Sequence, residues 1–202
     1  MMPAARESLL DAAYTALARR PWSAVRMVDV AAAAGVSRQT LYNEFGSKDG
    51  LARALVRREA DGFLAGVERA LAAHPEPRER LAATAEWIAE AARENALARA
   101  LLTGCWSERL PALALTAVPS TSAVPAQRRA DGPLPSPGDF VALVRDRAVA
   151  VVCGPGEDKA EAAEAARCCE LVVRLALSCV AAPPGEGGVA GLVRGVLYRQ
   201  PV

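Results

Sequence analysis

The sequence has few of the residues that catalysis or metal binding requires. Its 202 residues include one histidine, His74, and five cysteines, with no Cys-x-x-Cys spacing. Zinc is usually held by four clustered Cys, His or acidic ligands, so no metal site is expected. A Ser or Cys nucleophile needs a partner base, and His74 stands beside Pro75 in a helix-breaking segment. The sequence therefore predicts no catalytic residues, no metal and no cofactor, and hence no enzyme.

Long apolar runs and a strong net charge are also lacking. No apolar stretch approaches the roughly 18 residues that can cross a membrane, and charges interrupt the N-terminus where a signal peptide would be apolar. We therefore expect a cytoplasmic protein with no membrane segment and with reduced thiols. The adjacent Cys168 and Cys169 are then better explained as small buried side chains than as a redox sensor. A net charge of +1 is too small to indicate polyanion binding by itself.

Aromatic residues make up only 4 % of the chain, whereas 52 % of its residues are hydrophobic, most of them Ala, Val and Leu. This composition, with few alternating β-branched runs, favours helices. We expect an all-α fold of about nine helices. An N-terminal helix-turn-helix domain would be joined by a long helix to a C-terminal helical bundle.

The most informative segment covers residues 28–51. A short helix from Met27 ends at Gly35, a second helix opens at Ser37, and a third begins near Ser47. Glycine suits the turn because closing one helix and entering the next usually takes a positive φ. The hydroxyl of Ser37 can cap the second helix by accepting from a backbone N–H two or three residues later. Two helices joined in this way form a helix-turn-helix, whose second helix fits the DNA major groove.

The second helix has two different faces. Val36, Leu41 and Phe45 recur at nearly helical spacing, so they can anchor it. The opposite face carries side chains that suit DNA, because Arg pairs with guanine, Gln or Asn with adenine, and hydroxyls with phosphates. The expected DNA-binding residues are Ser37, Arg38, Gln39, Thr40, Tyr42, Asn43 and, at the start of the next helix, Lys48. The alternative is a helical hairpin whose polar residues simply face water.

The stretch AGVSRQTLYNEFGSKDGL resembles the N-terminal DNA-binding segment of the TetR (tetracycline repressor) family. That family usually shows Ala-Gly-Val-Ser followed by Leu-Tyr, Phe, Ser-Lys and Leu, all of which occur here in the same order. The resemblance covers only the N-terminal third of the chain. It implies that Thr40, Tyr42 and Lys48 position the DNA backbone, and that the variable base-reading residues are Arg38, Gln39 and Asn43.

One position departs from the family pattern. The family commonly has Thr or Ser as the cap of the first of the two helices, and here that position is Arg26. Arginine has no acceptor oxygen with which to cap a helix. We expect this helix either to fray at its start or to be capped by Ser23.

The rest of the chain shows further helical patterns. A helix over residues 4–18 would complete the N-terminal bundle, and apolar residues at multiples of four predict one continuous helix over residues 47–72. The expected domains are a DNA-binding domain at 1–46, a connecting helix at 47–73, and a ligand-sensing and dimerisation domain at 74–202.

The C-terminal domain contains one stretch without a helical pattern. Residues 117–138 hold five prolines with scattered Ser and Gly, which predicts a flexible loop. A weak helix is expected before it, at 107–116. The helical pattern resumes at Asp139 and continues in two final helices, at 157–181 and 187–199.

These two final helices are the expected dimer interface. A short Pro/Gly turn joins them, so the pair can form a four-helix bundle with the same pair of a second subunit. The expected interface residues are Ala165, Cys169, Val172, Val173, Ala176, Val180, Val193 and Val196. Alternatively, these side chains close the core of the monomer. The family resemblance favours the homodimer, which doubles the number of reading helices.

The function expected from these features and the resemblance is a sequence-specific transcriptional regulator. It would bind a palindromic operator in double-stranded DNA, most often as a repressor, and release it when an unknown small molecule enters the C-terminal domain. Trp87 and Trp106 are the candidate pocket residues, although each is more often a core residue. The alternatives are a helical interaction module and a bundle enzyme, neither of which would bind DNA.

Overall fold

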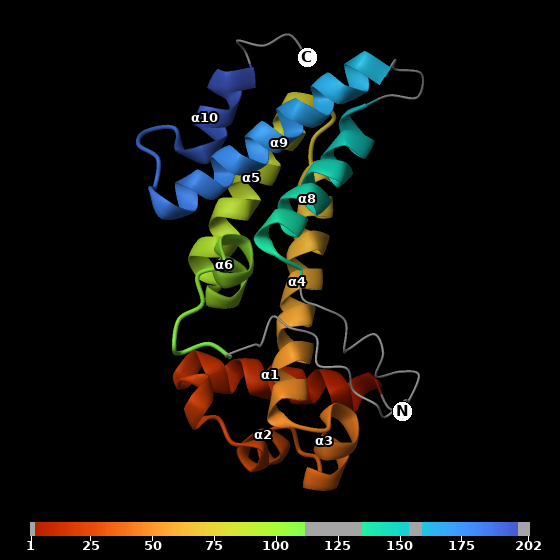
Figure 1. Ribbon diagram of the computed structural model, residues 1–202, viewed down its shortest axis with the longest axis vertical. Helices are drawn as coiled ribbons and strands as arrows, with labels where there is room; N and C mark the ends of the chain where they lie inside the picture. The colour runs from red at the N-terminus through yellow and green to blue at the C-terminus, as the bar shows by residue number, and fades with distance from the viewer. Residues whose placement is uncertain (1–2, 112–134, 154–158, 198–202) are drawn as a thin grey trace. The chain divides into compact units, whose positions relative to one another are not determined.

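A computed structural model describes residues 3–111, 135–153 and 159–197, and all regular secondary structure in these ranges is helical (Figure 1). The described part of the chain contains nine α-helices and one short 3₁₀ helix. Their bounds are α1 (Pro3–Arg19), η1 (Trp22–Ala24), α2 (Met27–Ala33), α3 (Arg38–Phe45), α4 (Lys48–Ala72), α5 (Pro77–Glu94), α6 (Ala96–Thr103), α8 (Pro137–Val152), α9 (Lys159–Ala181) and α10 (Gly188–Leu197). The predicted all-α class is confirmed.

Contacts within the chain divide it into two compact units. One comprises Met1–Glu59 with Trp106–Leu134, and the other comprises Ala60–Cys105 with Pro135–Val202. Helix α4 begins in the first unit and ends in the second. The continuous helix expected at 47–72 is thus present with almost the expected bounds.

The first unit forms where the apolar positions of α1, α2, α3 and the first turns of α4 meet. Leu9, Val30, Leu41 and Leu51, one from each helix, are at most 1 % exposed. At the edge of this core, the Arg58 guanidinium on α4 donates to the carboxylate of Asp11 on α1, at 2.6 Å. The core and this ion pair together hold the helix-turn-helix segment on the base of α4.

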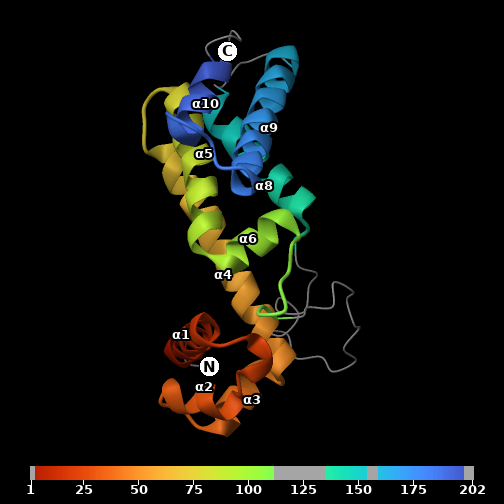
Figure 2. The same ribbon diagram turned by 90° about the vertical axis from the view of Figure 1, so that its left-hand side faces the viewer.

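The second unit is organised around α5, which packs against α6, α9 and α10, while α8 packs along α9 (Figure 2). The rings of Phe140 on α8 and Phe63 on α4 pack edge to face, with their centroids 6.0 Å apart. Helix α5 meets α4 through Trp87, whose indole N–H donates to the Phe63 carbonyl at 3.2 Å. A Cβ on Gly66 would lie 2.1 Å from the Trp87 ring, so this approach needs a glycine at position 66.

Two sequence-based expectations are wrong in part. Residues 107–111 form a turn and irregular backbone where a weak helix was expected at 107–116, and the rest of that segment lies outside the described residues. Helix α8 begins at Pro137, inside the predicted loop 117–138, of which residues 117–134 lie outside the described residues. A proline fits the first turn of a helix, because its missing N–H would have no partner there.

A capping box defines this helix start. The Ser136 hydroxyl accepts from the backbone N–H of Asp139 at 3.2 Å, and the Asp139 carboxylate accepts from the backbone N–H of Ser136 at 2.8 Å. The hydrogen bonds to Ser136 hold the pKa of Asp139 below its ordinary value. The capping residues were therefore present in the sequence, and the prolines before them obscured the helix start.

Candidate nucleic-acid interface

The turn between α2 and α3 has the geometry that the sequence predicts. Helix α2 ends at Ala33, and Gly35 adopts a φ of +68°. The N–H of Gly35 donates to the Ala32 carbonyl at 3.2 Å, and the N–H of Val36 donates to the Ala31 carbonyl at 3.0 Å. These bonds satisfy the last carbonyls of α2, and the left-handed glycine directs the chain into the next helix.

Helix α3 is capped at its start and anchored along one side. The Ser37 hydroxyl accepts from the backbone N–H of Thr40 at 3.0 Å, as the cap predicted at this position. Leu41 is fully buried and Phe45 is 8 % exposed. The guanidinium of Arg6, on α1, lies 4.9 Å from the centroid of the Phe45 ring. The opposite side of α3 is therefore held in a fixed direction toward solvent.

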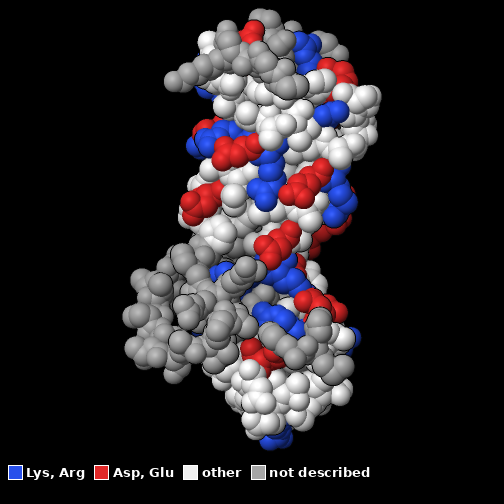
Figure 3. Space-filling view, turned by 90° about the vertical axis from the view of Figure 1, so that its right-hand side faces the viewer, with Lys and Arg blue, Asp and Glu red and all other residues white. Residues whose placement is uncertain are grey.

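The residues expected to bind DNA all lie in the first unit, on α3 or next to it. Arg38, Gln39, Tyr42 and Asn43 are exposed, as is the cap Ser37. Thr40 and Lys48 are half-buried. In the face drawn in Figure 3, the surface around α3 is mainly uncharged, with basic side chains at its lower edge. A ligand that meets this surface would be bound mainly by hydrogen bonds and less by net charge.

Four of these side chains are bonded in pairs. The hydroxyls of Ser37 and Thr40 lie 2.8 Å apart, and the Gln39 amide nitrogen donates to the Asn43 amide oxygen, also at 2.8 Å. Because one hydroxyl of the first pair donates to the other, only one hydroxyl proton remains for an outside acceptor such as a phosphate oxygen. In contrast, the Arg38 guanidinium has no hydrogen-bond partner within the described part of the chain.

Lys48 stands at the first residue of α4, where a positive charge is unfavourable because the helix dipole is positive there. Its ammonium donates to the Ser23 carbonyl at 3.1 Å and lies 5.6 Å from the centroid of the Trp22 ring. These two contacts offset the cost of that position and leave two N–H groups for an anion. Sequence reasoning missed Trp22 and Ser23, which lie on η1 and have no spacing relation to Lys48.

Arg26 does not cap α2, yet the helix begins at Met27 directly after it. The Arg26 guanidinium donates to both carboxylate oxygens of Asp29, each at 3.1 Å, and Arg20 donates to the same carboxylate at 3.2 Å. The hydrogen bond from Arg26 is the main reason that the pKa of Asp29 lies below its ordinary value. The expectation that Ser23 caps α2 was wrong, because Ser23 belongs to η1 and α2 has no side-chain cap.

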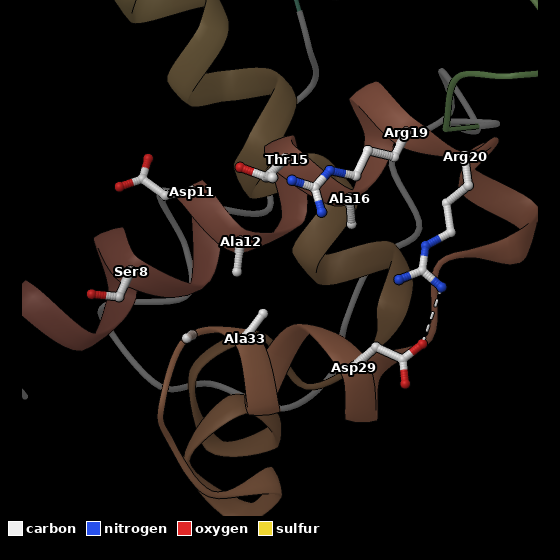
Figure 4. A pocket seen from close by; sticks show the side chains of 10 residues that line it. Ser8, Asp11, Ala12, Thr15, Ala16, Arg19, Arg20, Asp29 and Ala33 are labelled. Atoms are coloured by element: carbon white, nitrogen blue, oxygen red, sulfur yellow. Dashed lines mark hydrogen bonds and ion pairs between the residues drawn. The ribbon is translucent and has the colours of Figure 1, made fainter.

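A shallow pocket of about 470 Å³ lies between α1 and α2 in the same unit. Figure 4 shows its small side chains, among them Ala12 and Ala33, and the ion pair of Arg20 with Asp29 at one end. Neither tryptophan expected in a ligand pocket lines it. Trp87 packs on Gly66 in the second unit, whereas the half-buried Trp106 belongs to the first. Trp87 therefore contributes to helix packing, and its role in a ligand pocket stays a prediction.

The residues expected at a dimer interface have two different environments in the single chain. Those buried in the second unit, each at most 3 % exposed, are Cys169, Val172, Val173, Ala176 and Val193. Those that are half-buried are Ala165, Val180 and Val196. The exposed large apolar side chains of α9 and α10 are instead Leu171 and Leu192, at 43 % and 44 % exposed.

Sequence reasoning missed both leucines, although Leu171 carried a signal. It stands one turn from Arg167 and one turn from Arg174, on the charged side of α9. A large apolar side chain among charged ones on an exposed helix face is typical of a surface that contacts a partner.

The adjacent Cys168 and Cys169 of the second unit are buried, at 7 % and 1 % exposed. Burial, followed by the neighbouring Cys168 and Cys153, raises the pKa of Cys169 to about 12. A thiol with such a pKa stays protonated and unreactive at neutral pH. In the residues that the structure describes, no group of three or more His, Cys, Asp or Glu side chains is placed to hold a metal ion.

The N-terminal part of the chain matches known proteins. Residues 9–55 match the family model of bacterial regulatory proteins, tetR family. Over 69 residues the chain is 51 % identical to the HTH-type transcriptional regulator AlkX of Mycobacterium tuberculosis, a stretch covering 34 % of this chain and 33 % of that protein. Over 81 residues it is 38 % identical to the HTH-type transcriptional activator FasR of Mycolicibacterium smegmatis, covering 40 % and 37 %. The matched stretch thus spans about a third of each relative.

The fold as a whole is similar to solved structures. The TetR family repressor AlkX from Dietzia sp. matches with a TM-score of 0.52 and 22 % identity, over 96 % of this chain and 94 % of that one. A putative TetR-family transcriptional regulator from Rhodococcus sp. matches with a TM-score of 0.54 and 20 % identity, over 98 % of each chain. At such low identity these matches bear on the fold alone.

The turn, the cap and the anchored helix together form a helix-turn-helix, the motif that places its second helix in the DNA major groove. Residues 9–55 are similar to the DNA-binding segment of the tetR family, and the fold of the described chain is similar to that of solved TetR-family proteins. Of the helices described, none is long and apolar enough to span a bilayer.

Proposed function

We propose that the protein is a sequence-specific transcriptional regulator that binds a palindromic operator as a homodimer in the cytoplasm and responds to a small molecule. The observation that supports this most strongly is α3. One side of that helix is fixed by Leu41 and Phe45, and the other presents exposed hydrogen-bonding side chains. A helix held in this way can enter the major groove without losing its own packing.

In this proposal the residues of the site divide into base-reading and phosphate-binding groups. Arg38 has its whole guanidinium fork available, which matches the O6 and N7 acceptors of guanine. Lys48 carries a charge already held in place by Ser23 and Trp22, so it loses little freedom on meeting a phosphate. Tyr42, which is 48 % exposed, adds a phenolic donor for the DNA backbone.

The proposed dimer uses the exposed side of α9 and α10. Leu171 and Leu192 are large apolar side chains that are 43 % and 44 % exposed to water in the single chain. Half-buried Val196 and Ala165 extend the same helices' apolar surface. A two-fold axis through such a surface would give two α3 helices, spaced to meet successive major grooves about 34 Å apart.

The proposed response to a ligand depends on α4, which continues from one unit into the other. In the second unit α4 is held by Trp87 at Phe63 and by the ion pair of Glu68 with Arg147, at 3.0 Å. An effector that separates α4 from its partners there would move the helix that carries the reading domain. Thr84 is the only polar residue in the buried set of the described chain, so the effector we propose is apolar or weakly polar.

The test is selection of bound duplexes from a random DNA pool at moderate ionic strength. We expect an enriched inverted repeat whose half-site spacing matches one turn of DNA or a multiple of it. A triple variant with Arg38→Ala, Gln39→Ala and Asn43→Ala should lose the enrichment. The matched control, Arg99→Ala, removes an exposed arginine of α6 and should keep it. No enriched sequence with the unmodified protein would overturn the proposal.

The direction of regulation needs a separate measurement, because one similar protein is named a repressor and another an activator. A reporter driven by the selected operator, with and without the chain, measures this directly. We expect lower expression in the presence of the protein. Higher expression would correct the proposal to an activator and leave DNA binding untouched.

A further inference from the structure

A hydrogen bond joins the side chains of Gln39 and Asn43 on α3, and DNA binding in general does not require it. Both side chains are exposed, and they stand one helical turn apart. The Gln39 amide nitrogen donates to the Asn43 oxygen at 2.8 Å. We propose that these two residues act as one reading unit that selects adenine, in which Gln39 contacts the base and Asn43 positions the Gln39 amide. This inference rests on the proposed function.

The donor and acceptor count of the pair supports adenine. A glutamine amide has one oxygen and two N–H groups, and one of these N–H groups is taken by Asn43. The oxygen and the second N–H stay available side by side. In the major groove, adenine offers an N6–H donor next to the N7 acceptor, which is the complement of that arrangement. Guanine offers two acceptors there, and would leave the Gln39 oxygen without a donor.

Asn43 has a different role because its oxygen is already engaged. Toward the DNA it retains its two N–H groups, so it acts mainly as a donor. The pair as a whole is therefore expected to read one base, the adenine that Gln39 contacts.

The energetic reason for such a pair is preorganisation. A free glutamine side chain on a helix surface samples several rotamers, and ordering it on binding costs about 0.5–1.5 kcal/mol. Asn43 fixes the Gln39 amide before DNA arrives, so part of that ordering is already done. Loss of the positioning bond should therefore weaken the preference for adenine by about 2- to 10-fold per half-site.

Two substitutions of nearly equal shape separate this role from a direct contact. Asn43→Asp keeps an oxygen that accepts from Gln39, whereas Asn43→Leu has no acceptor. In a selected operator with each base placed in turn at the Gln39 position, Asn43→Asp should keep the adenine preference, although its negative charge weakens overall affinity. Asn43→Leu should lose that preference by the stated factor. Equal preferences in the two variants would overturn the positioning role.

A double-mutant cycle tests whether the two residues act as one unit. Gln39→Ala and Asn43→Ala should affect the same base position, and the double variant should lose little more there than Gln39→Ala alone. The control cycle combines Gln39→Ala with Arg38→Ala, whose fork is unpaired, and its two effects should add. Independent readers would instead give additive losses at two separate positions, which would overturn the inference.

A measurement without DNA checks the bond itself. Nuclear magnetic resonance of the Gln39 side-chain amide should show a shifted and slowly exchanging proton that disappears in Asn43→Leu and remains in Asn43→Asp. An amide signal that ignores both substitutions would contradict the pair. If the unmodified protein shows no sequence preference at all, the proposed function fails; if preference exists but these patterns do not, only the present inference fails.

Discussion

Helices α3 and α9 are both amphipathic, but the residues expected to function lie on the polar face of α3 and on the apolar face of α9. On α3 the residues expected to function are polar, and the structure leaves them exposed or half-buried. On α9 they are apolar, and several, such as Val172 and Ala176, are buried within the second unit. A polar face can only be a surface, whereas an apolar face can close a core or bind a partner. The pattern alone cannot separate those two uses.

The largest effect is expected from Val172→Asp on the buried face of α9. Val172 is 1 % exposed, so the new carboxylate would have neither water nor a partner. We expect the free energy of unfolding to fall by about 3–5 kcal/mol. Chemical denaturation followed by circular dichroism measures this loss. If the variant stayed as stable as the parent chain and merely became monomeric, Val172 would belong to the interface and the distinction between the two faces of α9 would be lost.

The next largest effect should come from the exposed leucines. Leu171→Asp with Leu192→Asp should leave the free energy of unfolding of a monomer nearly unchanged, since both side chains already contact water. If they meet the partner, each leucine buried there contributes about 1.5–3 kcal/mol, so the dimer should dissociate. Sedimentation velocity over a range of concentrations is the measurement. If the double variant remained a dimer, the interface would lie on another surface of the chain.

On α3, Arg38→Ala should cost roughly 1–3 kcal/mol of binding and relax the preference at one base pair of each half-site. The side chain has no partner in the described chain, so the fold should not suffer. Quantitative binding to an operator and its single-base variants checks both points. An equal loss on every sequence would make Arg38 a phosphate contact instead of a reader.

The smallest expected effect is that of Lys48→Ala. One phosphate contact per half-site contributes a slope of about −0.9 in the dependence of log K on log salt concentration, so the total slope should become shallower by that amount per half-site. The weakening should be uniform across sequences. A slope equal to that of the unmodified protein would mean that Lys48 serves only to join η1 to α4 through Ser23.

The sequence could predict those contacts of the site whose two residues lie close together in the chain, and could not predict those whose residues lie far apart in it. Gly35 and the cap Ser37 were predicted because a turn and a cap involve residues two to four apart. The bond of Gln39 to Asn43 has the same short range, and spacing could have found it, since residues four apart on a helix are neighbours. Lys48 and Ser23 lie 25 residues apart, and no local pattern relates them.

The α8 start shows how one strong signal can conceal another. Several prolines before it made the stretch 117–138 read as a loop, yet Pro137 occupies the first turn of a helix, where its fixed φ is favourable. Ser136 and Asp139 form a capping box that was readable in the sequence. Proline was treated as a helix breaker at a position where it is a helix starter.

The sequence by itself determined the helical class, the helix-turn-helix and the polar face of α3, because hydrogen bonds within one or two turns and the spacing of apolar residues decide these. Only the tertiary structure decided which apolar faces are covered, with Val172 inside the second unit and Leu171 outside it. It also decided that Trp87 fills the contact with Gly66. Burial depends on segments that lie far apart in the chain and meet only after folding, so no local pattern records it.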